Sequence, residues 1–234
     1  MSSALSNPAT IQKRLVLGCG ALAHDMVALL KQDKGFEQLI DIHCLPANLH
    51  HKPQLIAGAV DKYLAQHADQ YADVLVAYGD CGTSGELDKV LQNYNARRIA
   101  GEHCFEFFTG KNEYQELVDQ ELGSFFLTDF LVKFFDSFVV EGLGLDRYPE
   151  LFDAYFKHYT KMIYVAQTKN SKLQKMAKAQ AQSFGLEYEY RHVGIKGIRP
   201  LIENLPLQDS LFGKIEINYQ AIDHTHNSTQ NRLT

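Results

Sequence analysis

Short apolar runs alternate with amphipathic helical patterns along the first half of the chain. The runs at residues 14–17, 39–45 and 73–78 predict buried strands. The segments that follow them, at residues 21–31, 53–67 and 86–94, carry apolar residues at helical spacing, and Ser84 is expected to cap the third helix. This alternation is typical of an α/β fold with a mainly parallel sheet and helices on both faces.

The middle of the chain is rich in Phe and Tyr and predicts a helical section. Its most apolar stretch, residues 124–143, is interpreted as one buried helix because it contains four charged residues, more than a membrane span tolerates. Beyond it, residues 161–166 and 187–193 predict strands on either side of a helix at 171–184. This second alternation of strands and helices is compatible with two similar lobes.

These patterns divide the chain into five parts. We expect a flexible N-terminus at residues 1–13, an α/β lobe bearing cysteines and histidines at 14–110, and a helical section at 111–160. A second α/β lobe at 161–222 and a flexible tail at 223–234 complete the chain.

Composition narrows the classes of function. The 234 residues are 45% hydrophobic and 11% aromatic, which excludes intrinsic disorder. A net charge of −5 argues against a nucleic-acid partner. The N-terminal residues lack the basic and apolar regions of a secretory signal, so we expect a cytoplasmic protein with reduced thiols and no membrane partner. The sequence does not decide the oligomeric state.

Three of the four cysteines occupy similar positions, at or just beyond the ends of predicted strands. They are Cys19, Cys81 and Cys104. Ligands of parallel sheets bind outside the carboxyl ends of the strands, so these thiols are expected to converge on one edge and to bind zinc. An iron–sulfur cluster is the alternative cofactor, and a metal-free core of buried cysteines is the structural alternative. Cys44 is interpreted as a core residue.

Other polar residues and glycines surround these cysteines. His103 and His50 are expected to handle protons or to orient a substrate, and His50 lies at the same sheet edge as the cysteines. Asp80 and Glu106, next to the cysteine motifs, are expected to orient these groups. Four glycines are expected to allow close backbone approach to a bound cofactor: Gly18, Gly20, Gly79 and Gly82.

Seven segments of the chain together resemble the DUF1638 family of bacterial and archaeal proteins. In order, they read LGCGALAHDM, LPANLHHKP, VAYGDCGTSGELD, GEHCFEFFTG, FFLTDFL, GLGLDRYPEL and YVAQT, between about residues 15 and 195. The family pattern maps onto Cys19, His50, Cys81, His103 and Cys104, and it is the main reason for preferring His50 to His51. Where many members read HCYEFY, this chain reads HCFEFF, which removes two hydroxyls but no expected ligand.

The resemblance implies a place in one-carbon metabolism, near corrinoid proteins and methyltransferases. We therefore expect a metal–thiolate protein acting in methyl transfer. It would bind and activate a small sulfur or nitrogen compound, or serve a corrinoid methyltransferase system. The alternatives are a non-catalytic delivery protein for such a system and an iron–sulfur-dependent lyase or dehydratase-like enzyme. Whether the chain is itself an enzyme stays open.

Overall fold

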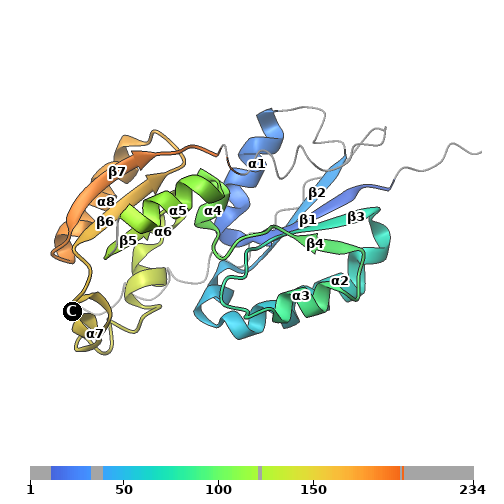
Figure 1. Ribbon diagram of the computed structural model, residues 1–234, viewed down its shortest axis with the longest axis horizontal. Coiled ribbons are helices and arrows are strands. Elements are labelled where there is room, and N and C mark those ends of the chain that lie inside the picture. Colours follow the sequence, from blue (N-terminus) through green and yellow to red (C-terminus); the bar gives the residue numbers. More distant parts are fainter. Residues whose placement is uncertain (1–11, 33–38, 121–122, 196, 198–234) are drawn as a thin grey trace, which may run out of the picture.

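The protein contains two parallel β-sheets that lie side by side as two lobes (Figure 1). A computed structural model describes residues 12–32, 39–120, 123–195 and 197. The predicted α/β class, with parallel pairing, is confirmed. The expected flexible tail, the first 11 residues and most of the chain beyond residue 195 lie outside the described residues.

The first sheet has four strands in the order β2-β1-β3-β4. Their bounds are β1, Arg14–Cys19; β2, Ile40–Leu45; β3, Asp73–Ala77; and β4, Ala96–Arg98. All neighbouring strands are parallel, and Gly18 at the end of β1 pairs with Cys44 on one side and Ala77 on the other. The central strands are apolar along their length because helices cover both faces.

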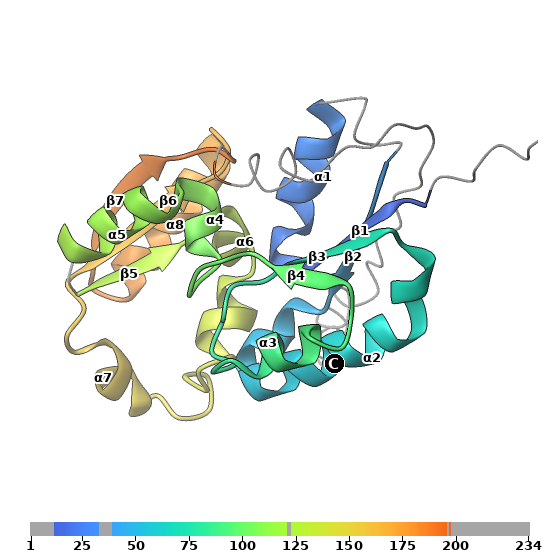
Figure 2. The same ribbon diagram turned by 45° about the vertical axis from the view of Figure 1, so that its right-hand side comes forward.

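Helix α1, Ala23–Gln32, lies on one face of this sheet, and α2, Ile56–His67, and α3, Glu86–Leu91, lie on the other (Figure 2). Short 3-10 turns at Gly20–Leu22, Ala47–His51, Pro53–Leu55 and Ala68–Gln70 link these elements. The expected cap of α3 is wrong: Gly85, in a left-handed conformation, precedes the helix, and no side chain caps it.

The second sheet has three strands, β5, Ser124–Leu127; β6, Lys161–Ala166; and β7, Glu187–His192. Alternate residues of β6 face two different layers. Met162 and Tyr164 join the cluster formed with α6, Asp129–Lys133, and α8, Ser171–Ser183. Ile163 and Val165 pack with Leu117 of α5, Lys111–Gln120.

The expected single helix at residues 124–143 is wrong. Its first four residues form β5 because Phe125 and Phe126, which favour strands, pair with β6. Thr128 then starts α6 by accepting a hydrogen bond from Leu131 N at 3.2 Å, and a π-helical turn follows at Asp136–Val140. The section expected to be helical thus supplies a strand to the second sheet, as well as α5, α6 and α7, Leu151–Phe156.

The remaining short helix, α4, Phe105–Thr109, follows β4 and begins directly after Cys104. No helix in the described part of the chain is long and apolar enough to span a bilayer.

Candidate functional site

The strand order of the first sheet creates a switch point between β1 and β3. The chain runs from β1 to β2 on one side, then crosses to β3 on the other side of β1. Ligands of open α/β sheets bind outside the carboxyl ends of the strands at such a point. Cys19 ends β1, and Cys81 follows β3 by four residues.

Cys19 and His50 form a close pair at this edge. His50 lies in the turn after β2, and its Nε2 is 3.1 Å from Cys19 Sγ. Ala21 N donates a hydrogen bond to the same sulfur at 3.4 Å. Burial raises the pKa of the Cys19 thiol to about 12, with further contributions from the nearby Cys81 and Cys44. Burial also lowers the pKa of His50, so the pair is neutral at pH 7.

The loops after β3 and β4 hold Cys81 and Cys104 next to each other. Cys81 N donates to the carbonyl of Glu102 at 2.9 Å, and Asp80 N donates to that of Gly101 at 2.9 Å. Burial raises the pKa of the Cys104 thiol, and the charges of Cys81 and then Cys19 raise it further. Burial likewise raises the pKa of Cys81. The structure therefore brings the three predicted cysteines within electrostatic range of one another.

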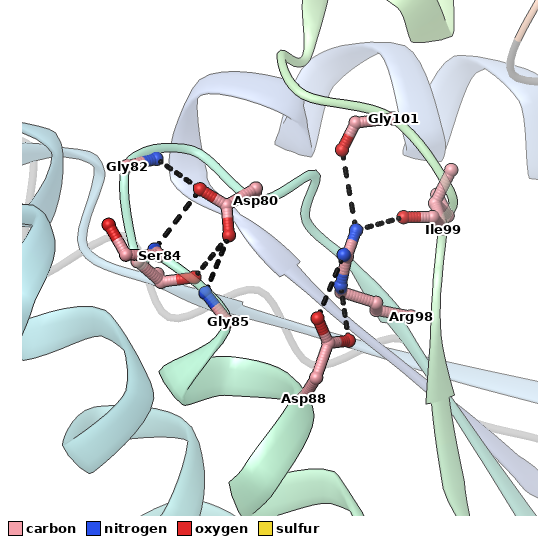
Figure 3. A network of polar contacts seen from close by, with 9 residues as sticks. Asp80, Gly82, Ser84, Gly85, Asp88, Arg98, Ile99 and Gly101 are labelled. Atoms are coloured by element: carbon pink, nitrogen blue, oxygen red, sulfur yellow. Dashed lines mark hydrogen bonds and ion pairs between the residues drawn. The ribbon is translucent and has the colours of Figure 1, made fainter.

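Asp80 organises the loop that carries Cys81. Its carboxylate accepts hydrogen bonds from Gly82 N at 3.2 Å, Ser84 N at 3.2 Å and Gly85 N at 3.0 Å (Figure 3). The Thr83 hydroxyl donates to it at 3.1 Å. These bonds, that from Gly85 first, lower the pKa of Asp80. The side chain thus fixes the loop from within.

Arg98 joins this loop to the next one. Its guanidinium donates to the Asp88 carboxylate at 2.6 and 2.9 Å, and to the carbonyls of Ile99 at 3.0 Å and Gly101 at 3.3 Å (Figure 3). A bidentate Arg–carboxylate pair of this kind is geometrically well defined. It ties α3 to the backbone that precedes His103 and Cys104.

Glu106 plays the corresponding role in the loop after β4. The side chain is 8% exposed and accepts hydrogen bonds from Glu102 N at 2.7 Å and His103 N at 3.3 Å. Gly101 has a φ of +136°, and a Cβ there would lie 2.7 Å from Oε2 of Glu106, so a larger residue would be strained. His103 itself is exposed, with its ring edge-on to that of Tyr114 at 6.4 Å between centroids.

The four glycines predicted to approach a cofactor each face another part of the protein. A Cβ on Gly18 would lie 2.5 Å from Met26 Cε, and one on Gly79 would lie 3.1 Å from the backbone of residues 101 and 102. Gly20 adjoins the carbonyl of Leu45, and Gly82 adjoins the ring of Pro53. Their small size therefore has a packing role within the loops that carry Cys19 and Cys81.

No group of three or more Cys, His, Asp or Glu side chains within the described ranges is arranged to hold a metal ion. The donor types at the sheet edge, three thiols and an imidazole, do fit a thiophilic cation such as zinc. Two ligands of one tetrahedral zinc ion, with bonds of about 2.3 and 2.0–2.1 Å, lie about 3.6 Å apart. The Cys19–His50 separation of 3.1 Å is shorter than that value and is that of a direct thiol–imidazole hydrogen bond.

Sequence reasoning missed Tyr78, which is 1% exposed beside the cysteines. Its hydroxyl lies close enough to the Cys19 thiol to influence its pKa, but it makes no hydrogen bond of normal geometry with any described residue. Tyr78 directly follows β3 in an apolar run, where a tyrosine is indistinguishable from a core residue. That Tyr78 lies beside the thiols is evident only from the structure, in which Cys19 ends the neighbouring strand β1.

The apolar middle section contains two aspartates, Asp129 and Asp146, either of which could pair with Arg147, and in the structure Asp129 has other partners. Tyr164 Oη donates to its Oδ1 at 2.6 Å and Gln167 N donates at 3.0 Å, while Thr168 donates to Oδ2 through both its N and its hydroxyl. Arg147 instead lies 3.7 Å from Asp146 at the surface.

Comparison with known proteins identifies a family but no characterised relative. Residues 44–202 match the family model described as "Protein of unknown function (DUF1638)". No curated protein and no solved structure matches the chain. The matched range contains His50, Cys81 and Cys104, and it begins after Cys19. It covers more than half of the sequence, and the chain therefore belongs to the DUF1638 family.

Proposed function

We propose that the chain is a metal–thiolate protein that serves methyl transfer in one-carbon metabolism. Cys19, Cys81 and Cys104 would supply the thiolates, and His50 would be the fourth protein group at the site. The single observation that carries the proposal is the grouping of three thiols, from three separate loops, within electrostatic range at the switch point. Sites at this position bind ligands in many α/β proteins.

The raised thiol pKa values define what a bound cation would have to do at this site. Without a cation, each buried thiol keeps its proton, because a thiolate in this apolar environment has no compensating charge. A bound divalent cation supplies that charge and displaces the protons. Zinc, when bound by thiolates, supplies Lewis acidity that keeps a coordinated sulfur or nitrogen compound reactive at neutral pH.

The other residues of the site would orient these groups and handle protons. His50, whose Nε2 is 3.1 Å from Cys19 Sγ, would take part in moving the thiol proton away when the site is loaded, and as a neutral imidazole it would not keep that proton. Asp80 and Glu106 are positioning residues, because they hold the loops of Cys81 and Cys104 through backbone hydrogen bonds. His103 is exposed beside Cys104 and would contact a small-molecule substrate or a corrinoid partner.

Elemental analysis tests the metal site. Protein produced with zinc and iron available is expected to contain about one equivalent of zinc. Cys19→Ala, Cys81→Ala and Cys104→Ala are each expected to reduce it below about half an equivalent, because three thiolates are needed for tight binding. Cys44→Ala is the matched control, because Cys44 acts on the pKa of Cys19 but is not among the charges that raise the pKa of Cys104.

Less than about half an equivalent of any metal in the wild type would contradict the proposal. If the protein contains iron and is visibly coloured, the bound group is an iron–sulfur cluster and not zinc.

Methyl transfer is tested separately. Metal-loaded protein is expected to transfer a methyl group from methylcobalamin to a small thiol or amine, and Cys81→Ala is expected not to. Turnover that requires an added corrinoid protein would assign the chain an accessory role. No transfer under either condition would remove methyl transfer from the proposal and leave the metal site to be judged on metal content.

A further inference from the structure

A pocket of about 220 Å³ lies between the two lobes, and none of the four cysteines lines it. One wall consists of α1 and the turn before it, including Gly20, Ala21 and Ala28, whose small side chains leave the space open. The opposite wall consists of α6 and the residues that follow it. Gly20 and Ala21 come directly after Cys19, so the pocket and the thiol site share one turn of the backbone.

Aromatic rings form much of the second wall. Phe130 and Phe134, one helical turn apart, both line the pocket, and their ring centroids are 4.8 Å apart. Aromatic faces attract cations through the ring quadrupole, especially where water is excluded.

Two carboxylates line the same pocket in contrasting states. Asp129, on α6, already accepts four hydrogen bonds from its own lobe. Asp25, on α1, is partly buried and makes no hydrogen bond or ion pair with any described residue; Lys133 acts on it through its charge alone. Burial, and then the charge of Asp129, raise the pKa of Asp25 to about 7, while Lys133 opposes this shift. A buried carboxylate without a partner is costly unless a ligand supplies one.

We propose that this pocket binds a small alkylammonium ion, with Asp25 as the anionic partner and the rings of Phe130 and Phe134 against its alkyl groups. The site goes beyond the proposed metal function and does not require the cysteines to hold an ion. A cation between these groups would satisfy the Asp25 carboxylate and make favourable contact with the aromatic faces.

The other charged and titratable groups that line the pocket are His24, Asp129 and Lys133. Lys133 is exposed, so water and salt screen its repulsion of a cation more strongly than they screen the attraction of partly buried Asp25. His24 is exposed on the same rim. Asp129 adds a second negative charge, and the balance therefore favours a cation over an anion.

Calorimetric titration of the metal-free full chain with tetramethylammonium and n-butylammonium tests the proposal, with 1-butanol and butyrate as neutral and anionic controls. Both cations are expected to bind more tightly than either control. Asp25→Asn is expected to weaken cation binding about 10- to 100-fold, the usual effect of losing a charged partner. Phe134→Leu is expected to weaken it about 2- to 5-fold.

Tetramethylammonium does not titrate, so its pH dependence reports on Asp25. Its affinity is expected to be constant well above pH 7 and to fall below pH 7 by about 10- to 100-fold in all, the loss expected for Asp25→Asn. Asp153→Asn, at an exposed position on α7, is the matched control and is expected to bind like the wild type. Circular dichroism establishes that each variant is folded.

Three outcomes would overturn the proposal. They are tighter binding of butyrate than of either cation, unchanged cation affinity in folded Asp25→Asn, and no cation binding at pH 8. The Cys81→Ala variant separates this result from the metal site, because it is expected to bind the cations normally even if the metal proposal fails.

Discussion

Both parallel sheets carry polar side chains at their carboxyl edges, but the chemistry differs. One edge has a carboxylate that accepts several hydrogen bonds, and the other has protonated thiols. At the second sheet, Asp129 follows β5 and accepts four hydrogen bonds, three of them from residues after β6. At the first sheet, Cys19 ends β1 and Cys81 follows β3, both as protonated thiols with raised pKa values. The hydrogen-bonded edge of the second sheet is a structural junction, whereas the thiols of the first edge are neutral and would lose their protons only to a bound cation.

Asp25 and Asp129 repeat this contrast on the two sides of one pocket. Asp129 is 6% exposed and its oxygens are fully used by its own lobe. Asp25 has no partner of this kind among the described residues. The difference predicts that Asp129 stabilises the fold and that Asp25 destabilises it when no ligand is bound.

The largest effect is expected from Asp129→Ala. Removing the acceptor leaves several buried donors unsatisfied, so the free energy of unfolding is expected to fall by about 3–5 kcal/mol. Denaturant unfolding measures it, and Asp136→Ala, at an exposed position, is expected to stay within about 0.5 kcal/mol of the wild type. A loss below about 1 kcal/mol for Asp129→Ala would show that the second edge is not the hydrogen-bonded structural junction described above.

A smaller and opposite effect is expected from Asp25→Asn. The folded pKa of about 7 lies above the ordinary unfolded value of about 3.9. The folded protein therefore binds an extra proton between these values, and the wild type loses stability as pH rises through them. Asp25→Asn is expected to raise the free energy of unfolding by about 2 kcal/mol at pH 8 and by less at pH 5.

Denaturant unfolding of both proteins at the two pH values measures this difference. A difference that does not change between pH 5 and pH 8 would mean that Asp25 titrates normally.

The smallest effect concerns backbone strain in the loop after β3. Cys81 and Ser84 both have left-handed backbone angles, with φ of 49° and 54°. Ser84→Gly is expected to raise the free energy of unfolding by about 0.5 kcal/mol and to leave metal content unchanged. Cys81→Gly relieves the same kind of strain but removes a thiolate, so metal content is expected to fall. Equal metal content in the two variants would show that Cys81 is not a ligand.

Most of the fold follows from local pattern. Strands such as β3 and β6 are buried on both faces, and their continuous apolar runs mark them clearly. β5 was missed because its four residues open a long Phe-rich segment whose hydrophobicity suits a strand or a helix equally well. Its identity depends on pairing with β6, which lies more than thirty residues further along the chain.

The candidate site was likewise predictable only in part. The positions of Cys19, Cys81 and Cys104 at strand ends predicted that they gather at one edge, because parallel strands end together. The use of Glu106 and Asp80 as backbone acceptors depends on loop geometry that the sequence does not encode in any recognisable motif. Asp25 was missed because its importance arises only when α1 meets α6 from the other lobe.

Cobalt(II) titration of metal-free protein under reducing conditions tests the central claim most directly, because cobalt bound by thiolates gives charge-transfer absorption. The account predicts saturation at about one equivalent, with thiolate absorption that each of Cys19→Ala, Cys81→Ala and Cys104→Ala reduces and that Cys44→Ala leaves unchanged. Saturation without thiolate absorption, or identical spectra for all four variants, would contradict it.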